Sequence, residues 1–504
     1  MTIRPDFETF ARTHDAGRPQ LVWTKLVADL ETPVSAFLKL ADGRPNSFLF
    51  ESVEGGSVRG RYSFIGTKPD LIWRCRGQRA EINRRARADA AGFAPEAQPA
   101  LDSLRALVAE CRVEIPDALP PMAAGLFGYM GYDMVRLMER IPDKTRDVLG
   151  VPDGMFLRPT IVAIFDNIED MVTVVTPAWP ARGATARAAY DQARERLADT
   201  VADLDRATPS KREQAVDAAE LPEPRSNMTR ERFHEMVRKG KEYVFAGDIF
   251  QVVLSQRFAV PFTLPPLALY RALRRLNPSP FLFFLDLGDF AIVGSSPEIL
   301  VRLRDNKVTI RPLAGTRKRG DTPAEDRALA EELLSDPKEL AEHLMLLDLG
   351  RNDVGRVTKV GTVRVTEKFE IERYSHVMHI VSNVEGELDP AHDAISALVG
   401  GFPAGTVSGA PKIRAMEIID ELESERRGIY AGAVGYFAGN GAMDTCIALR
   451  TAVVKDGVVY IQAGGGVVAD SDPEAEFQET RNKARALVRA CEEAVRFAAL
   501  GGKG

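Results

Sequence analysis

Short connections between strand-like segments are the feature that most constrains the fold of this chain. Four runs rich in β-branched and aromatic residues follow one another in its second half, at residues 249–258, 281–287, 290–294 and 307–312. Most of the segments that join them are too short to hold the crossover helix that a parallel strand pair requires. The pattern favours an antiparallel sheet over repeated βαβ units, and with the helical segments around it predicts an α+β fold.

The N-terminal part has the same mixed α+β character and is followed by a polar stretch. Its strand-like runs are interrupted by glycine and proline and fall at 47–50, 62–65, 161–165 and 171–175. A charged helix is expected at 184–206, and the polar, proline-containing residues after it predict a linker at about 207–227. We therefore expect one region at 1–225 and a second at 226–504. Residues 84–100, rich in alanine, arginine and proline, predict a surface loop or insertion.

Composition excludes several classes of protein. The 504 residues carry a net charge of −6, which lacks the basic excess that binding to nucleic acid or anionic lipid needs. The four cysteines, at 75, 111, 446 and 491, form no Cys-x-x-Cys pair, so neither a disulfide framework nor a structural zinc is expected. The uncharged run 428–443 is too short for a membrane span, and the N-terminus has no apolar signal region. These features predict a cytoplasmic protein in a reducing compartment.

Two later segments begin in the same way and predict helices with a carboxylate in the second turn. Asp336 is the expected N-cap of the first helix, and either Ser471 or Asp472 caps the second. The second-turn carboxylates are Glu342 and Glu479. They belong either to solvated faces, where Glu479 pairs with Lys483 four residues on, or to a site for a hard divalent cation such as Mg²⁺. Spacing alone does not choose between these interpretations.

Glycine-rich segments and two histidines are further candidates. Residues 313–316 and 463–466 follow strand-like runs and are expected to be turns, whose backbone amides either bind a carboxylate or serve only to reverse the chain. Residues 405–412 resemble a phosphate-binding loop but lack its Gly-Lys-Ser/Thr ending, which excludes nucleotide binding. His376 and His379 are either core residues or proton-transfer groups. The residues alone thus predict an α+β enzyme with a carboxylate–magnesium site for a small dianionic substrate.

The order of the motifs is more specific than any one of them. The series resembles the chorismate-utilising enzymes, and among them the large subunit (component I) of anthranilate synthase. The resemblance is dense over residues 233–488 and extends weakly to the N-terminal part through FLFESVEGG and RYSFIG. It implies two packed antiparallel sheets flanked by helices, with the N-terminal region interleaved with the rest. The motifs are IFQVVLSQRF (249–258), SSPEIL (295–300), RPLAGTRKRG (311–320), AEHLMLLDLGRNDVGRV (341–357), VMHIVSNVEGEL (377–388), FPAGTVSGAPKIRAMEII (402–419), YAGAVGY (430–436), IALRTAVV (447–454) and QAGGGVVADSDPEAEFQETRNKA (462–484).

The resemblance implies roles for individual residues. Glu342 and Glu479 match the family's Mg²⁺ ligands. Glu298 matches the acid that protonates the departing ring hydroxyl, and His379, rather than His376, matches the histidine associated with the later loss of pyruvate. The positions that match chorismate-binding residues are Gly315, Thr316, Thr406, Tyr430, Arg450, Gly464, Gly465, Gly466 and Lys483.

Two further positions distinguish this chain from related enzymes. Gln251 replaces the lysine base of the water-adding isochorismate and salicylate synthases, which favours ammonia as the nucleophile. Ala314 replaces a lysine usual in aminodeoxychorismate synthases, which favours direct ortho amination.

The implied activity is that of a lyase, in which chorismate and ammonia give anthranilate and pyruvate, the first step of tryptophan biosynthesis. Because the chain has no Cys-His-Glu set of its own for releasing ammonia from glutamine, a separate glutamine amidotransferase subunit (component II) is expected as partner. Region 1–225 resembles the part that binds L-tryptophan as feedback inhibitor, and region 226–504 the catalytic domain. The alternatives are an aminodeoxychorismate synthase component I and a non-catalytic tryptophan-binding regulatory subunit. The expected inhibitor-binding residues are Glu51, Ser52, Pro280, Phe281 and Leu282, of which Phe281 and Leu282 stand where many relatives have Tyr and Met.

Overall fold

The computed structural model describes residues 1–501 except 42, 55–57, 182, 210–221 and 375–376. Its strands join into one network of antiparallel ladders with two branches that meet at the long strands β3 (Val58–Arg76) and β7 (Gly154–Asp166). These two strands pair along most of their length, so each sheet continues into the other. The antiparallel arrangement predicted from the short connections is confirmed.

The first branch runs from the N-terminal strands to the middle of the chain. Its strands, in spatial order, are β1 (Gln20–Val27), β8 (Met171–Ala178), β7, β3, β2 (Ser47–Glu54), β11 (Phe281–Asp286), β12 (Ala291–Ser296), β21 (Thr451–Lys455), β22 (Val458–Val467) and β10 (Gln251–Pro261). Two short strands, β9 (Arg225–Ser226) and β18 (Gly409–Ala410), pair with β10.

The second branch leaves β7 near its N-terminal end, on the same edge that β8 occupies further along the strand. Its strands are β6 (Gly125–Met130), β19 (Ala433–Ala438), β20 (Met443–Ile447), β13 (Ile299–Arg304), β14 (Lys307–Ile310) and β17 (Val377–Glu387), with β15 (Leu313–Lys318) and β16 (Arg364–Arg373) also paired to β17. Strands β4 (Arg79–Asn83) and β5 (Ala94–Pro95) extend the edge of β3.

An aromatic core lies between the two branches. Phe48 on β2 stacks on Phe127 of β6 with ring centroids 4.7 Å apart, and Phe64 meets Tyr436 of β19 edge to face at 5.7 Å. Phe283 of β11 belongs to the same buried cluster. Because these side chains come from facing strands of both branches, the sheets pack face to face, as the resemblance implied.

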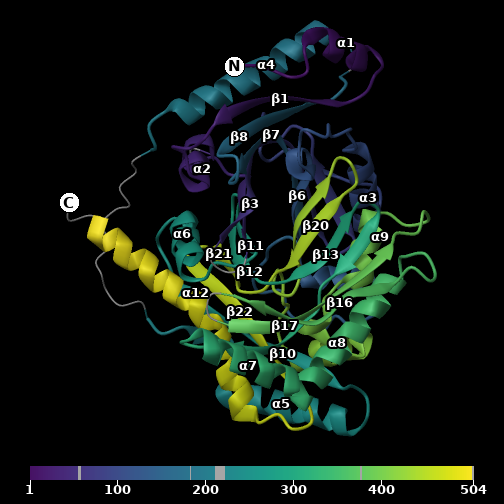
Figure 1. Ribbon diagram of the computed structural model, residues 1–504, viewed down its shortest axis with the longest axis vertical. Helices are drawn as coiled ribbons and strands as arrows, with labels where there is room; N and C mark the ends of the chain where they lie inside the picture. Colours follow the sequence, from purple (N-terminus) through teal and green to yellow (C-terminus); the bar gives the residue numbers. More distant parts are fainter. Residues whose placement is uncertain (42, 55–57, 182, 210–221, 375–376, 502–504) are drawn as a thin grey trace.

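Helices cover the outer faces of both sheets (Figure 1). A second buried cluster joins the first branch to the helices α2 (Pro33–Ala41), α4 (Ala186–Asp205), α6 (Pro266–Leu276) and α12 (Pro473–Gly501), and α1 (Phe7–Asp15) packs on α4. A third joins the second branch, together with β3, β10 and β22, to α3 (Ala100–Glu110), α5 (Arg230–Phe245), α8 (Pro337–Gly355), α9 (Ala394–Gly401) and α11 (Lys412–Leu422). The remaining helices are η1 (Pro121–Ala123), η2 (Tyr132–Leu137), α7 (Pro323–Ser335) and α10 (Gly405–Ser408). No helix of the described part is both long and apolar enough to cross a membrane.

The N-terminal and C-terminal parts share both sheets. Strand β2 pairs with β11, and β6 pairs with β19, so ladders cross the expected boundary at residue 225 in two places. The interleaving implied by the resemblance is therefore present. Much of the expected linker, residues 210–221, lies outside the described residues. Residues 84–100 form largely exposed turns with the short strand β5, as predicted for a surface loop.

Candidate active site

Capped helices begin on either side of the candidate site. Asp336 Oδ1 accepts hydrogen bonds from the N–H groups of the second and third residues of α8, at 3.0 and 3.4 Å. Asp472 Oδ1 does the same for α12, at 3.1 and 2.9 Å. The Ser471 hydroxyl instead donates to Glu476 Oε1 at 2.8 Å, so Asp472 is the cap of this helix. The caps fix where both helices start and which residues occupy their second turns.

The second-turn carboxylates of these helices interact. Burial raises the pKa of Glu342, and the charges of Glu339 and Glu479 raise it further, against the lowering effects of a hydrogen bond with Gln251 and the charge of Lys483. Lys483 Nζ lies 2.7 Å from Glu479 Oε1, so the expected i,i+4 ion pair is present. The charge of Glu479 still raises the pKa of Glu342, so the second-turn carboxylate of one helix acts on that of the other.

The donor chemistry of this pair suits magnesium. Mg²⁺ is usually held by one or two protein carboxylates together with substrate oxygens and water. The buried oxygen Oε2 of Glu476, whose charge neighbour is Glu479, has no hydrogen-bond partner among the described residues. The described residues contain no group of three or more His, Cys, Asp or Glu side chains that could hold a metal ion by themselves. The residues therefore fit an ion that Glu342 and Glu479 hold jointly with a substrate.

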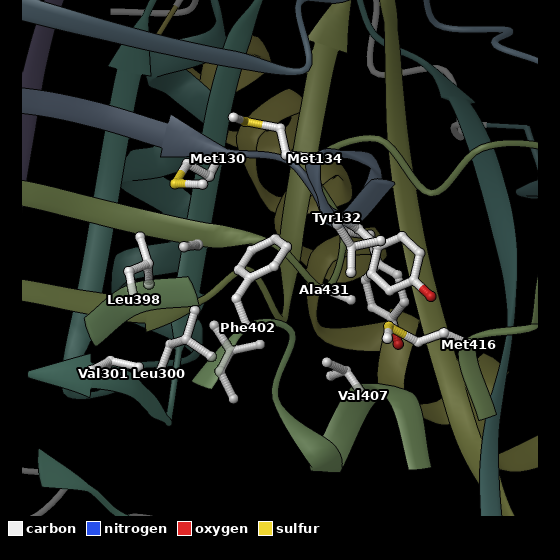
Figure 2. Close-up of a cluster of buried hydrophobic side chains, with 14 of the residues drawn as sticks. Met130, Tyr132, Met134, Leu300, Val301, Leu398, Phe402, Val407, Met416 and Ala431 are labelled. Carbon is white, nitrogen blue, oxygen red and sulfur yellow. The ribbon is translucent and has the colours of Figure 1, made fainter. Parts of the chain in front are cut away.

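Glu298 lies just beyond the end of β12 and is held by its neighbours in the core. Its Oε2 accepts a hydrogen bond of 3.0 Å from Thr406 Oγ1 on α10. Leu300 and Val407, each close in sequence to one of the two, are almost fully buried in the cluster of Figure 2. Burial raises the pKa of Glu298 to about 7, against the Thr406 hydrogen bond and the charge of Arg450, which lower it. A carboxyl group with this pKa can carry a proton at neutral pH and donate it.

Arg450 is a cation without a partner among the described residues. Its guanidinium group makes no hydrogen bond or ion pair with any other described residue, although its charge acts on both Glu298 and His379. Its backbone has φ +46°, a left-handed conformation that is uncommon for arginine, and its carbonyl accepts a hydrogen bond from Ser295 N–H at 3.2 Å. A ligand carboxylate would satisfy this side chain through paired N–H···O bonds.

His379 on β17 is a neutral base in this environment. Burial lowers its pKa to about 4. Its Nδ1 lies 3.2 Å from the Gly315 carbonyl oxygen, which can only accept, and 2.9 Å from Thr316 Oγ1. Nδ1 therefore carries the ring hydrogen and Nε2 keeps a lone pair. His376, the other candidate, lies outside the described residues.

The glycine segments are strands, so the expectation of turns is wrong. Gly315, with φ +82°, occupies a bulge of β15 where the register with β17 shifts. Gly464, Gly465 and Gly466 lie inside β22, opposite β10.

Close approach explains the three glycines of β22. A Cβ atom would lie 2.8 Å from the buried Tyr430 hydroxyl at Gly464, 2.8 Å from Glu476 Oε2 at Gly465, and 2.2 Å from Gln251 Nε2 at Gly466. Their function is thus to admit neighbouring side chains to the sheet surface. The Gly464 carbonyl accepts a hydrogen bond of 2.9 Å from Lys483 Nζ.

Sequence reasoning missed two polar residues near these groups. Tyr374 packs against the His379 ring at 5.5 Å and donates a hydrogen bond of 2.8 Å to Glu372. Asp353 on α8 forms a buried ion pair with Lys412 of α11. Neither belongs to a spacing pattern that indicates chemistry, and no signal in the sequence would have found them.

The five expected inhibitor-binding residues come together from two distant segments. Glu51, Ser52, Pro280, Phe281 and Leu282 all line one cavity of about 1120 Å³, and the ladder between β2 and β11 places Glu51 opposite Leu282.

The Glu51 carboxylate already has strong partners in this cavity. It accepts hydrogen bonds of 2.6 and 2.9 Å from Arg274 and one of 2.6 Å from the Tyr270 hydroxyl. Glu298 lines the same cavity, so the acid and the expected inhibitor pocket share one space.

With this fold and this cluster of groups, the chain belongs to the chorismate binding enzymes, whose family model matches residues 59–489. Within that family it is 64 % identical to anthranilate synthase component 1 of Cereibacter sphaeroides over 498 residues, which is 99 % of each chain. It is 50 % identical to anthranilate synthase component 1 of Pseudomonas putida, over 92 % of this chain and 93 % of the relative. The resemblance to anthranilate synthase large subunits is confirmed.

Solved structures agree with these relatives. The crystal structure of anthranilate synthase component I from Streptococcus pneumoniae TIGR4 matches with a TM-score of 0.77 and 36 % identity, over 92 % of this chain and 98 % of that one. MenF, the menaquinone-specific isochorismate synthase of Escherichia coli, matches with a TM-score of 0.70 at 21 % identity, over 96 % of this chain and 98 % of that one, which extends the likeness of fold alone.

Proposed function

We propose that this chain is the chorismate-converting component of an anthranilate synthase, which turns chorismate and ammonia into anthranilate, pyruvate and water. The observation that carries the proposal is the guanidinium group of Arg450. It has no partner within the described part of the chain, and its charge acts on both a carboxyl with a pKa of about 7 and a neutral histidine. An anionic substrate bound by Arg450 would lie between a proton donor and a proton acceptor. Elimination of a hydroxyl group and later of pyruvate requires both.

Chorismate has two carboxylates, and the site offers a place for each. Arg450 can clamp one carboxylate bidentately. Glu342 and Glu479 would hold Mg²⁺, which when bound draws electron density from the conjugated ring through the ring carboxylate. The positions proposed to complete the chorismate site are Gly315, Thr316, Thr406, Tyr430, Gly464, Gly465, Gly466 and Lys483.

The protein's side chains divide the proton transfers between them. Glu298 donates its proton to the departing ring hydroxyl, which leaves as water, while ammonia adds beside the ring carboxylate. Gln251 contributes a buried Oε1 without a hydrogen-bond partner among the described residues, which can accept a hydrogen bond from the incoming ammonia. The amine is added as an ammonium group and loses one proton to solvent, which balances the proton that Glu298 gave to the departing water.

His379 acts in the second elimination. Its Nε2 lone pair takes the proton from the ring carbon that bears the new amine. The enolpyruvyl group then leaves and is protonated to pyruvate, and the ring becomes aromatic. With a pKa of about 4, His379 is in its basic form throughout the neutral range.

The supply of ammonia and the inhibition by tryptophan are part of the same proposal. We assign ammonia release from glutamine to a separate component II subunit. Residues 1–225 would form the tryptophan-binding region and 226–504 the catalytic one. L-Tryptophan would bind in the large cavity against Ser52, Pro280, Phe281 and Leu282, with Glu51 held in place by its pairing with Arg274.

Product analysis separates this function from its alternatives. Purified chain is incubated with chorismate, Mg²⁺ and ammonium sulfate, with and without L-tryptophan, and the product is followed by fluorescence and mass. Anthranilate whose formation is suppressed by tryptophan is the expected result. A para-amino product would indicate an aminodeoxychorismate synthase. Chorismate binding without any product would indicate a non-catalytic regulatory subunit.

A further inference from the structure

Glu298 also lines a second, small cavity. Apart from Glu298, Ile299 and Arg311, its lining residues differ from those of the large cavity. Its volume is about 30 Å³, which leaves room for about two water molecules. Its walls are mainly apolar, from residues such as Leu346, Leu349 and Ile447. Its polar side chains are those of Glu298, Thr406, Asp353 and Arg311.

One of these polar groups lacks a partner. Asp353 is 4 % exposed, and its Oδ1 has no hydrogen-bond partner among the described residues. Its other oxygen, Oδ2, accepts a hydrogen bond of 2.7 Å from Lys412 Nζ, which is itself buried. A buried carboxylate oxygen without a partner costs free energy, whereas a polar space beside it can hold the water that satisfies it.

We propose that water in this cavity joins Asp353 to Glu298, and that Asp353 is a positioning residue for the proton that Glu298 carries. The water donates one hydrogen to Asp353 Oδ1, because an ionised carboxylate only accepts. Its lone pairs are then directed away from Asp353 and accept from the protonated form of Glu298. The chain of hydrogen bonds thus favours Glu298 as a neutral acid, the form that the proposed reaction needs at each turnover. The inference rests on the proposed role of Glu298.

Charged groups around the two carboxyls support this direction of transfer. Burial raises the pKa of Asp353 and lowers that of Lys412, and the attraction between the two groups opposes both shifts. Their contact of 2.7 Å is that of an ammonium group facing a carboxylate. On the other side, Arg450 and Lys483 favour the ionised form of Glu298, and burial opposes them. The other charged or titratable groups that act on one member of this set are Arg356, Glu139, Tyr374 and Tyr430.

Infrared spectroscopy on the full chain tests the proposal without turnover. The C=O stretch of protonated Glu298 is identified as the band that Glu298→Gln removes, and its titration midpoint is expected near pH 7. In Asp353→Asn the amide can donate to the water and reverse its orientation. We therefore expect the midpoint to fall by about one pH unit, the equivalent of one ordinary hydrogen bond. The midpoint of the basic limb in the pH profile of kcat/KM for anthranilate formation should move to lower pH by the same amount.

A second variant and a control make the outcome decisive. Asp353→Asn leaves Lys412 unpaired, so Asp353→Asn/Lys412→Met, which removes both charges, tests the same shift in a neutral core. Asp133→Asn is the control, because Asp133 is equally buried and is paired with Arg136 at 2.5 Å but does not line the cavity. A midpoint that stays within a few tenths of a unit in both Asp353 variants overturns the inference. If Glu298→Gln removes no C=O band and is fully active, the proposed role of Glu298 is overturned instead.

Discussion

Removing the Thr406 hydroxyl should make the active site work at higher pH, even though it deletes a contact to the proposed acid. Thr406 Oγ1 donates to Glu298 Oε2 at 3.0 Å, and this hydrogen bond lowers a pKa that burial has raised to about 7. Hydrogen bonds to charged groups contribute about 1.5–3 kcal/mol, and one pKa unit corresponds to about 1.4 kcal/mol. Thr406→Val keeps the volume and removes the donor. The pKa of Glu298 should therefore rise by about one to two units.

The assay follows the basic limb of the pH profile. Because the protonated acid is the active form, kcat/KM for chorismate falls above the pKa of Glu298, and in Thr406→Val this fall should begin about one to two pH units later. Anthranilate fluorescence is recorded with free ammonia held constant at every pH, so that titration of ammonium does not shape the curve. Thr445→Val is the matched control, since its buried hydroxyl donates to the Val301 carbonyl instead. A limb that stays in place or moves to lower pH would refute the assignment of Glu298 as the titrating acid.

Three further outcomes test separate parts of the site. Glu298→Gln should be more stable than the parent at pH 8. The parent's Glu298 has a pKa of about 7 in the native state against the ordinary 4.5, so its free energy of unfolding falls by up to about 3 kcal/mol as pH rises from 4.5 through 7. Urea denaturation of both proteins at pH 4 and pH 8 measures this, and a stability difference that is equal at both pH values would contradict it. Glu479→Gln should raise the Mg²⁺ concentration for half-maximal activity by about tenfold or more, since even the loss of an outer-shell partner costs about that much; an unchanged Mg²⁺ titration would exclude Glu479 as a ligand. His379→Ala should let the aminated, pyruvate-bearing ring intermediate accumulate, detected by mass, and normal anthranilate formation would remove His379 from the mechanism.

Local patterns in the sequence predicted local structure well. Asp336 caps its helix as expected, because an N-cap needs only a side-chain oxygen and the N–H groups two or three residues on. The choice between Ser471 and Asp472 could not be made in advance. It depends on Glu476, whose buried carboxylate accepts the hydrogen bond of the Ser471 hydroxyl.

Residues that act through distant partners escaped local reasoning. The glycines of β22 look like a turn because nothing nearby shows that Tyr430 and Gln251 approach them from other elements. Nothing in the sequence around Glu51 indicated that Arg274 would form an ion pair with it. The roles proposed for Glu298, Arg450 and His379 were suggested by the order of the family motifs. The electrostatic environment of each residue is visible only in the three-dimensional arrangement.

The crossing ladders also set the order in which this chain can fold during synthesis. Strand β6, at residues 125–130, has its outer neighbour at residues 433–438, and β2 has one of its neighbours at residues 281–286. A ribosome that has made only the first half of the chain has therefore released sheet edges whose partners do not yet exist. Unpaired edges of this kind are prone to pair with other chains. We expect the nascent protein to depend on chaperones until translation is nearly complete, and separately expressed halves to aggregate unless they are produced together.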